Sequence, residues 1–287
     1  MIIKSLSDKK TLEQTALKIR LNIIREMKSN KGGHIGGSFD LAEVLSVIYN
    51  DFLRIDVKKP KSLDRDFMIL SKGHAGPALY ATLALKGIIP DSQLDNLNNI
   101  NSLLPGHCDR NKVLGADAST GSLGQGLSIA AGVALGAKIK NSDQRIFCIT
   151  GDGESAEGQI WEAAQFASHH KLDNLISFLD FNNMQIDGTV EEVMSLGDPV
   201  KKYQAFGWNA VEVDGHDVVA IQNGIKKAIE NKNNKPTMIV LKTIKGYGAK
   251  CITEMKNNHC IGLSDELLEK IMNELNQQAK ILEMEVH

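Results

Sequence analysis

Two short polar motifs in the 287-residue sequence each follow an apolar run. Gly151-Asp152-Gly153 comes directly after residues 145–150, and Asn182-Asn183 comes shortly after residues 174–179. Carboxylate and amide oxygens are hard ligands, which Mg²⁺ binds together with phosphate oxygens and water. The two motifs therefore indicate a magnesium ion that is bound together with a phosphorylated ligand, with the backbone carbonyl of Met184 as a third protein donor.

The stretch that joins the two motifs has the length of one βαβ unit. Residues 145–150 and 174–179 are predicted to be parallel strands, and residues 155–170 form an amphipathic helix between them. Both strands of such a unit run the same way, so Asp152 and Asn182 are expected to converge at the edge where open α/β sheets bind ligands. The helix from Ser155 would direct its first amides at the phosphates.

A purely structural reading of Gly151-Asp152-Gly153 is a strand-to-helix turn in which the aspartate caps the helix. That reading explains one motif but gives no reason for Asn182-Asn183 after the second strand. The pair of motifs, correctly placed on neighbouring strands, favours the ligand site. The flanking glycines would let the backbone approach the phosphates closely.

The remaining pattern predicts an α/β fold, a parallel sheet with helices on both faces. Asp40 is expected to cap a helix that runs to about residue 50, and Ser264 to cap the last one. Further helices are predicted over residues 12–27, 127–138, 221–231 and 265–282 and from Pro77, and further strands over 66–70, 210–213 and 237–241. A glycine-rich turn is expected over 31–38 and irregular structure over 101–119. No linker or repeat divides the chain, so residues 1–287 are expected to form one domain.

Composition excludes several classes of function. Lys plus Arg is 33 and Asp plus Glu is 35, a net charge of −2, so no basic excess favours nucleic acid. No apolar run reaches the ~18 residues of a membrane helix, and the first ten residues lack the apolar centre of a signal peptide. The four cysteines show no CxxC spacing, and they are expected to be free thiols in a cytoplasmic protein.

Several further motifs surround the two polar ones. In chain order they are Lys31-Gly32-Gly33-His34-Ile35-Gly36-Gly37, Leu70-Ser71-Lys72-Gly73-His74, Pro105-Gly106-His107 and Ser119-Thr120-Gly121-Ser122-Leu123-Gly124-Gln125-Gly126. Gly-Asp-Gly, about thirty residues and Asn-Asn resemble the thiamine diphosphate fingerprint, and the other motifs resemble transketolase in sequence and in order. The resemblance covers essentially the whole chain but only the N-terminal, diphosphate-binding half of that family. It implies the thiamine-diphosphate-binding (PP-type) fold.

The resemblance also implies roles for individual residues. The metal ligands would be Asp152, Asn182 and Met184, with Mg²⁺ replaceable by Ca²⁺ or Mn²⁺. The cofactor would contact His74, Gly121, Ser122, Leu123, Gly153, Glu154, Asn182, Ile186 and His259. The catalytic groups that face the sugar would be His34, His107 and His259. The other four histidines, His169, His170, His216 and His287, have no such context and are expected to be structural or solvated.

The chain departs from the family beside two of the catalytic histidines. Cys108 follows His107 where the family has proline, and Cys260 follows His259 where the family has glycine. A metal site formed by the two His-Cys pairs is one alternative, and an altered substrate preference is the other. Neither pair has ligand spacing of its own.

The resemblance implies half of an enzyme. A transketolase moves a two-carbon ketol group from a ketose, usually phosphorylated, to an aldose through a dihydroxyethyl group on thiamine. The glutamate that activates the cofactor belongs to the family's pyrimidine-binding domain, which this sequence does not resemble. We therefore expect the pyrimidine-binding and C-terminal domains on a partner chain, an α2β2 assembly, and no activity without the partner.

Three other functions fit parts of the pattern. A thiamine-diphosphate-dependent synthase, or a ketol transferase of specialised metabolism with a non-standard acceptor, would use the same half. A non-catalytic partner that only keeps the fold would not need Asp152, Asn182 and the histidines. A nicotinamide-binding enzyme fits the strand–helix alternation, but the glycine run 121–126 follows an irregular segment rather than a first strand.

Overall fold

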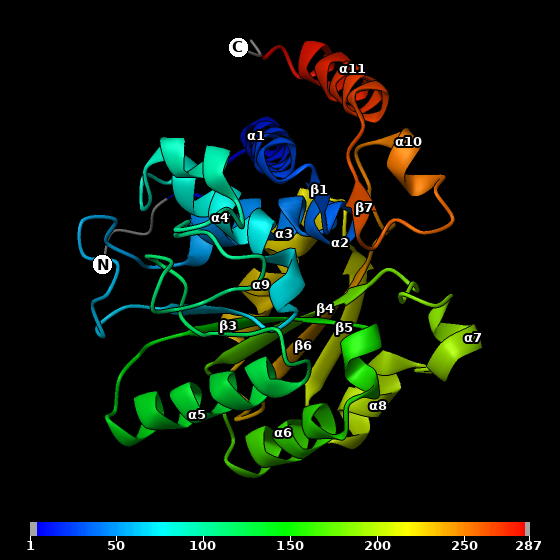
Figure 1. Ribbon diagram of the computed structural model, residues 1–287. Coiled ribbons are helices and arrows are strands. Elements are labelled where there is room, and N and C mark those ends of the chain that lie inside the picture. The colour runs from blue at the N-terminus through cyan, green and yellow to red at the C-terminus, as the bar shows by residue number, and fades with distance from the viewer. Residues whose placement is uncertain (1–4, 285–287) are drawn as a thin grey trace.

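A five-stranded sheet with strand order β2-β3-β4-β6-β5 forms the centre of the molecule, and all of its strand pairs are parallel. The computed structural model describes residues 5–284 (Figure 1). The strands are β2 (Phe67–Leu70), β3 (Ile146–Gly151), β4 (Leu175–Phe181), β5 (Asn209–Asp214) and β6 (Thr237–Lys242). The predicted parallel sheet is confirmed, and each predicted strand lies within two residues of its observed position.

Helices cover both faces of the sheet, as predicted (Figure 1). On one face lie α1 (Lys9–Asn30), α3 (Ala42–Val47), α4 (Gly76–Leu85) and α9 (Val218–Glu230), and on the other lie α5 (Gln125–Ile139), α6 (Gly158–His169) and α8 (Pro199–Ala205). Alternate strand residues enter the two cores, because successive side chains point to opposite faces. Phe147 and Ile149 join the first core, whereas Ile146 and Cys148 join the second.

The glycine-rich segment that follows α1 is more ordered than a turn. It contains β1 (Gly32–Gly33) and the short helix α2 (Ile35–Phe39), and the next helix, α3, continues into a π-helix (Ile48–Phe52). The prediction that Asp40 caps that helix is wrong, since α3 begins after Leu41 without a side-chain cap. The Asp40 carboxylate instead accepts hydrogen bonds from Gly246 and Asn182, because long-range partners outcompete the local cap.

The predicted helix from Ser155 is also wrong at its start. Residues Gly153–Ala156 form a 3₁₀ helix, and α6 begins at Gly158 because Glu157 has an extended backbone (φ −71°, ψ 127°). The amides nearest to Asp152 therefore belong to a tight 3₁₀ turn and not to the first turn of an α-helix.

A second, two-stranded sheet joins distant parts of the chain. β1 pairs antiparallel with β7 (Ile261–Gly262), directly before the last helix α11 (Asp265–Ile281), which Ser264 caps as predicted. A Cβ on Gly32 would lie 2.3 Å from the carbonyl oxygen of Ile261, so the pairing needs glycine there. The pairing brings His34, just after β1, next to His259, just before β7.

Short elements complete the chain. They are 3₁₀ helices at Gly73–Ala75 and Asp91–Asn96 and the helices α7 (Val190–Met194) and α10 (Lys250–Thr253). Residues 101–119 contain no helix or strand, as predicted. Between residues 5 and 284, no helix is long and apolar enough to cross a membrane. His287 and the first four residues of the N-terminal segment lie outside the described residues.

Candidate active site

The two polar motifs meet at the carboxyl edge of the sheet. Gly151 of β3 is in register with Asp180 of β4, and the Asp152 N–H donates to the Asp180 carbonyl at 3.1 Å. The Asp152 carboxylate accepts hydrogen bonds from the backbone N–H of Gly153 at 2.7 Å and of Asn183 at 2.6 Å. The predicted convergence of the motifs is therefore observed.

The Asn182 amide has a defined orientation. Its Nδ2 donates to Asp40 Oδ2 at 2.9 Å and to Asp180 Oδ2 at 3.1 Å, and its Oδ1 accepts from the Met184 N–H at 3.0 Å. Because two carboxylates take the nitrogen end, the oxygen end is turned the other way. A hard oxygen donor is thus presented next to the Met184 backbone.

A cavity of about 180 Å³ opens at this edge. Its walls come from the ends of β2, β3, β4 and β6 and from the loops that follow them. The lining residues are Gly37, Lys72, His74, Leu123, Gly151, Asp152, Gly153, Glu154, Asn182, Met184, Gln185, Ile186, Asp187, Lys245 and His259. All three predicted metal ligands and seven of the predicted cofactor contacts are in this set.

Two lysines line the same cavity. Lys72 is buried and forms an ion pair with Asp180, which also accepts a hydrogen bond from the Thr243 hydroxyl. Burial opposes the charge on Lys72, but Asp180 and Asp40 outweigh it and raise the Lys72 pKa. Lys245 Nζ lies 3.3 Å from the Met184 carbonyl oxygen, and burial followed by repulsion from Lys72 lowers its pKa. The two ammonium groups can bind an anion, and the carboxylates of Asp40, Asp152 and Asp180 favour a divalent cation. The charges therefore suit an anion that is bound together with a divalent cation.

The residues of this cavity fit a magnesium–diphosphate group. Burial and then the nearby Asp180 raise the pKa of Asp152 to about 6, which marks a carboxylate whose negative charge lacks a full counter-charge. Asp152, Asn182 and Met184 supply three hard oxygens, and Mg²⁺ fills its octahedron with phosphate oxygens and water. Across residues 5–284, no three His, Cys, Asp or Glu side chains are arranged as the ligands of one metal ion.

Four histidines form one cluster beside the cavity. The ring of His34 lies 5.3 Å from that of His74, 5.7 Å from that of His107 and 5.2 Å from that of His259. His74 and His259 are 4.8 Å apart, centre to centre. The four residues that the sequence singled out from separate glycine-rich or irregular segments thus share one site.

Three of these imidazoles are neutral at neutral pH. Burial, followed by the charge of Lys245, lowers the pKa of His259 to about 3, and Lys245 Nζ lies 3.2 Å from its Nδ1. Burial, followed by Lys72, places the pKa of His74 far below its ordinary value. Burial, followed by His107, lowers the pKa of His34. A neutral imidazole can donate one hydrogen bond and accept another, which suits sugar hydroxyl and carbonyl groups.

Glu154 lines the cavity, but its carboxylate ties three loops together. Oε1 accepts from the Ser71 hydroxyl and from the Gly124 N–H at 2.8 Å, and Oε2 accepts from the Gly151 N–H at 3.0 Å. This carboxylate is therefore occupied by the scaffold.

The glycine-rich loop before α5, residues 121–124, contacts the histidine cluster where Gly121 packs against the ring of His107. Gly121 has a φ of 138°, and a Cβ there would lie 2.9 Å from the His107 ring. Gly121 and its neighbour Ser122, both predicted cofactor contacts, are not among the residues that line the cavity, whereas Leu123 is.

None of the four cysteines and none of His169, His170 and His216 lines the smaller cavity. All four cysteines are unpaired, as predicted. Cys108 is buried, and burial raises its pKa to about 12, so it is a neutral thiol. His169 and His170 are exposed, and His216 stacks on Tyr247 with ring centres 3.7 Å apart. These positions agree with structural or solvated roles.

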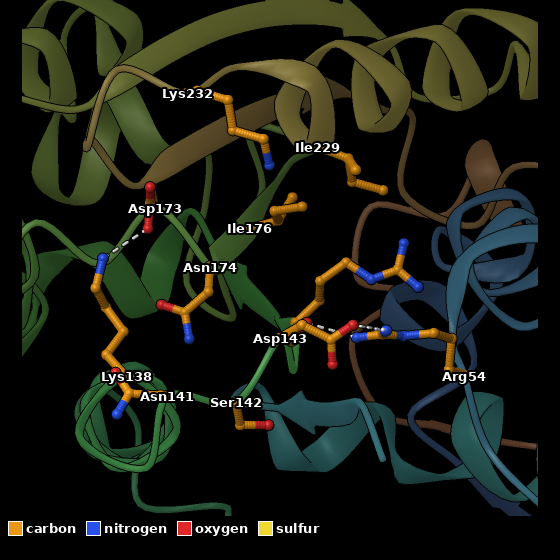
Figure 2. A pocket seen from close by; sticks show the side chains of 11 residues that line it. Arg54, Lys138, Asn141, Ser142, Asp143, Asp173, Asn174, Ile176, Ile229 and Lys232 are labelled. Atoms are coloured by element: carbon orange, nitrogen blue, oxygen red, sulfur yellow. Dashed lines mark hydrogen bonds and ion pairs between the residues drawn. The ribbon is translucent and has the colours of Figure 1, made fainter. Parts of the chain in front are cut away.

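A wider cavity of about 580 Å³ lies at the opposite, amino-terminal edge of the sheet (Figure 2). Three of its basic residues, Arg54, Lys138 and Arg145, are paired with acidic ones. Arg54 bonds Asp66 and Asp143, and Lys138 bonds Asp173. Among the described residues, no histidine lines this cavity, and its two carboxylates, Asp143 and Asp173, are already paired with Arg54 and Lys138, so the chemistry is assigned to the smaller cavity.

Several polar residues of the site were not predicted, among them Asp180, Lys245, Lys72 and Asp40. Asp180 and Lys245 follow or end parallel strands, a position that could have drawn attention to them because ligands bind at that edge. Lys72 lay inside a quoted motif without an assigned role. Asp40 gave no usable signal, since an aspartate before a helix is the ordinary pattern of a cap.

Comparison with known proteins decides the family. Residues 11–284 match the family model described as "Transketolase, thiamine diphosphate binding domain". The chain belongs to this transketolase family. The fold, the thiamine diphosphate binding and the transketolase class expected from the sequence are thereby confirmed.

Two of the relatives are similar in length to the chain. The 6-deoxy-6-sulfo-D-fructose transketolase subunit SqwG of Clostridium sp. (strain MSTE9) is 43% identical over 271 residues, which are 93% of this chain and 98% of that protein. An apulose-4-phosphate transketolase subunit of Phocaeicola vulgatus is 37% identical over 275 residues, which are 96% of this chain and 97% of that protein.

Solved structures place the chain in the transketolase fold. The crystal structure of Campylobacter jejuni transketolase superposes with a TM-score of 0.86 at 32% identity, covering 94% of this chain and 43% of that one. The chain thus spans less than half of that transketolase but nearly the whole of the two shorter relatives. The expected correspondence to the diphosphate-binding N-terminal half of the family is confirmed.

Proposed function

We propose that this chain is the cofactor-binding subunit of a two-subunit transketolase, which moves a two-carbon ketol group from a ketose or ketose phosphate to an aldose. The observation that carries the proposal is the convergence of Asp152, Asn182 and Met184 on one cavity with two lysines and the histidine cluster. Relatives that are named as transketolase subunits and have the same length support the split arrangement.

We propose that Mg²⁺ is held by the Asp152 carboxylate, the Asn182 amide oxygen and the Met184 carbonyl. Lys72, Lys245 and His74 would face the diphosphate, and the Gly153 backbone would approach it closely. Thiamine diphosphate, when bound, supplies a nucleophilic thiazolium carbon. Leu123 and Ile186 are apolar residues of the same cavity and would contact the organic part of the cofactor.

The three catalytic histidines would act on the sugar. The ring of His34 lies beside those of His107 and His259. The neutral imidazoles of His34 and His259 can orient a sugar hydroxyl group, polarise a carbonyl group or carry a proton from one of these groups to the other. The Lys245 ammonium beside His259 Nδ1 opposes protonation of that ring, so it keeps the imidazole neutral and able to hydrogen-bond the sugar at neutral pH.

We further propose that residues 1–287 form one domain and that a partner chain carries the pyrimidine-binding and C-terminal domains in an α2β2 assembly. Closed symmetric assemblies of this kind are the most common. A cytoplasmic location is part of the proposal, and the four unpaired cysteines agree with a reducing compartment.

Co-purification with the product of the neighbouring gene, followed by a ketol-transfer assay with thiamine diphosphate and Mg²⁺, tests the proposal. The donor panel should include fructose 6-phosphate, 6-deoxy-6-sulfo-D-fructose and apulose 4-phosphate, because the two relatives are named for the last two. Ketol transfer from any donor supports the proposal. If no ketose serves as donor but an added 2-oxo acid such as pyruvate loses carbon dioxide and its remaining two-carbon unit condenses with the aldose, the chain is part of a synthase. No turnover with any donor would leave only a binding role.

A further inference from the structure

Asp40 is a buried residue whose carboxylate bonds two segments that line the cavity. Its side chain is fully buried, with 0% exposure. Oδ1 accepts a hydrogen bond from the Gly246 N–H at 2.7 Å, and Oδ2 accepts one from Asn182 Nδ2 at 2.9 Å. One carboxylate therefore contacts both the segment after β4, which carries the candidate metal donors, and the loop after β6, which carries Lys245.

We propose that Asp40 is a positioning residue that fixes the Asn182 amide with Oδ1 toward the metal site and holds the Lys245 loop against it. This inference rests on the proposed function of the cavity. It assigns a role to a fully buried residue that does not line the cavity. Asp40 would thereby fix the position of the Lys245 ammonium group, which faces the phosphate, relative to the oxygen donors of Asn182 and Met184, which face the cation.

The physical need for such a residue comes from the symmetry of the amide. The oxygen and nitrogen ends of an asparagine are nearly the same in shape, so hydrogen-bond partners and not packing decide which end faces the cavity. At Asn182, the Asp40 and Asp180 carboxylates accept from Nδ2, and the Met184 N–H donates to Oδ1. The flipped amide would place oxygen against two carboxylates and nitrogen against a donor.

A carboxylate at position 40 can accept at both ends, which an amide cannot do. Asp40→Asn keeps the size of the side chain but turns one acceptor into a donor. That donor would face either Asn182 Nδ2, which favours the flipped amide, or the Gly246 N–H, which displaces the Lys245 loop. Asp40→Ala removes both contacts but introduces no opposing donor, and Asp180 still accepts from Asn182 Nδ2.

Asp40→Asn is therefore expected to weaken metal binding more than Asp40→Ala does. A merely structural role of Asp40 would give the reverse order, because alanine loses more packing than asparagine. Mn²⁺ can report the metal site directly by electron paramagnetic resonance in the presence of thiamine diphosphate. We expect Asp40→Asn to weaken Mn²⁺ binding by about 10–100-fold, as is typical of outer-shell partners, and Asp40→Ala to weaken it by less, about 3–10-fold. Circular dichroism and the unfolding midpoint show whether each variant is folded.

The outcomes separate the inference from the proposed function. The measurement is made on the complex with the partner chain, and if the wild-type complex does not bind Mn²⁺ with the cofactor, the proposed function fails. If it binds and Asp40→Asn binds within twofold of wild type, the inference is overturned while the proposed function stands. Stronger damage by Asp40→Ala than by Asp40→Asn also overturns it, because loss of packing would then explain the effect. Should Asp40→Asn not fold, unchanged affinity in Asp40→Ala overturns the inference.

Discussion

The backbone N–H of Asn183 donates a hydrogen bond to Oδ2 of Asp152 at 2.6 Å, across 31 positions of sequence. The bond exists because β3 and β4 are parallel neighbours whose carboxyl ends lie side by side. It turns the Asp152 carboxylate toward the segment that holds Asn182 and Met184. The proposed metal site depends on this hydrogen bond between the ends of β3 and β4.

Asp152→Ala should weaken the Mg²⁺-dependent binding of thiamine diphosphate by at least about tenfold, since even outer-shell substitutions cost that much. Isothermal titration calorimetry with Mg²⁺ and with EDTA measures the effect. Asp143→Ala is the matched control, because that carboxylate is 81% exposed in the cavity at the opposite edge. Equal cofactor affinity in Asp152→Ala and wild type would contradict the metal assignment.

Glu154→Gln should destabilise the chain rather than weaken cofactor binding alone. An amide would place a donor against one of the three donors that now bond the carboxylate, with a cost of about 1–3 kcal/mol in the free energy of unfolding. Urea unfolding measures this loss. Glu162→Gln on the exposed face of α6 serves as the control. A wild-type midpoint in Glu154→Gln would show that the three bonds do not hold the loops.

His107→Ala should lower kcat/KM of the assembled enzyme by about 10²-fold or more, the usual effect of a proton-transferring group. Cofactor affinity should stay within about twofold, since His107 does not line the diphosphate cavity. Steady-state kinetics and calorimetry on the same preparation separate the two effects, with exposed His170→Ala as the control. A parallel loss of cofactor affinity and activity would place His107 with the cofactor instead of the sugar.

Neutral buried histidines should make the stability of the apo chain depend on pH. An unfolded imidazole takes up a proton near pH 6.5, whereas the pKa values of folded His74 and His259 lie far lower. Their stabilising contribution is therefore complete above about pH 6.5 and is lost as the pH falls toward 3, at up to about 1.4 kcal/mol per pH unit for buried His74.

The comparison of wild type with His74→Gln isolates this effect. Buried carboxyl groups whose pKa is raised, such as Glu26, act in the opposite direction and contribute equally to both proteins. Urea unfolding between pH 7.5 and 5.5 should show a smaller fall in stability at low pH for His74→Gln. The same pH dependence in both proteins would mean that the pKa of His74 is the same in the folded and the unfolded chain, which contradicts this account.

Local pattern was enough to predict the sheet and the convergence of Asp152 and Asn182, the proposed metal donors, at one edge. Apolar runs of strand length, helices between them and polar residues at strand ends imply a parallel sheet with Asp152 and Asn182 at one edge, and no long-range information is needed. The four histidines followed from their glycine-rich or irregular surroundings and from the family resemblance. Their ring distances depend on pairings that the sequence alone does not show, above all β1 with β7.

The parts that sequence could not provide all depend on contacts between distant residues. Asp40 lies 206 positions from Gly246 and 142 from Asn182, yet it bonds both. Its local pattern was that of a helix cap, and the tertiary contact prevailed. The 3₁₀ turn after Asp152 was missed because the extended backbone at Glu157 has no sequence signature.

Ketol transfer by the isolated chain, by its partner chain, and by their mixture tests the central claim most directly. The assay uses a ketose phosphate donor, an aldose acceptor, thiamine diphosphate and Mg²⁺. We expect no turnover by either chain alone and full turnover on mixing, because this chain supplies the diphosphate-binding residues and the partner the remainder of the cofactor site. Turnover by the isolated chain at the rate of the mixture would contradict the claim.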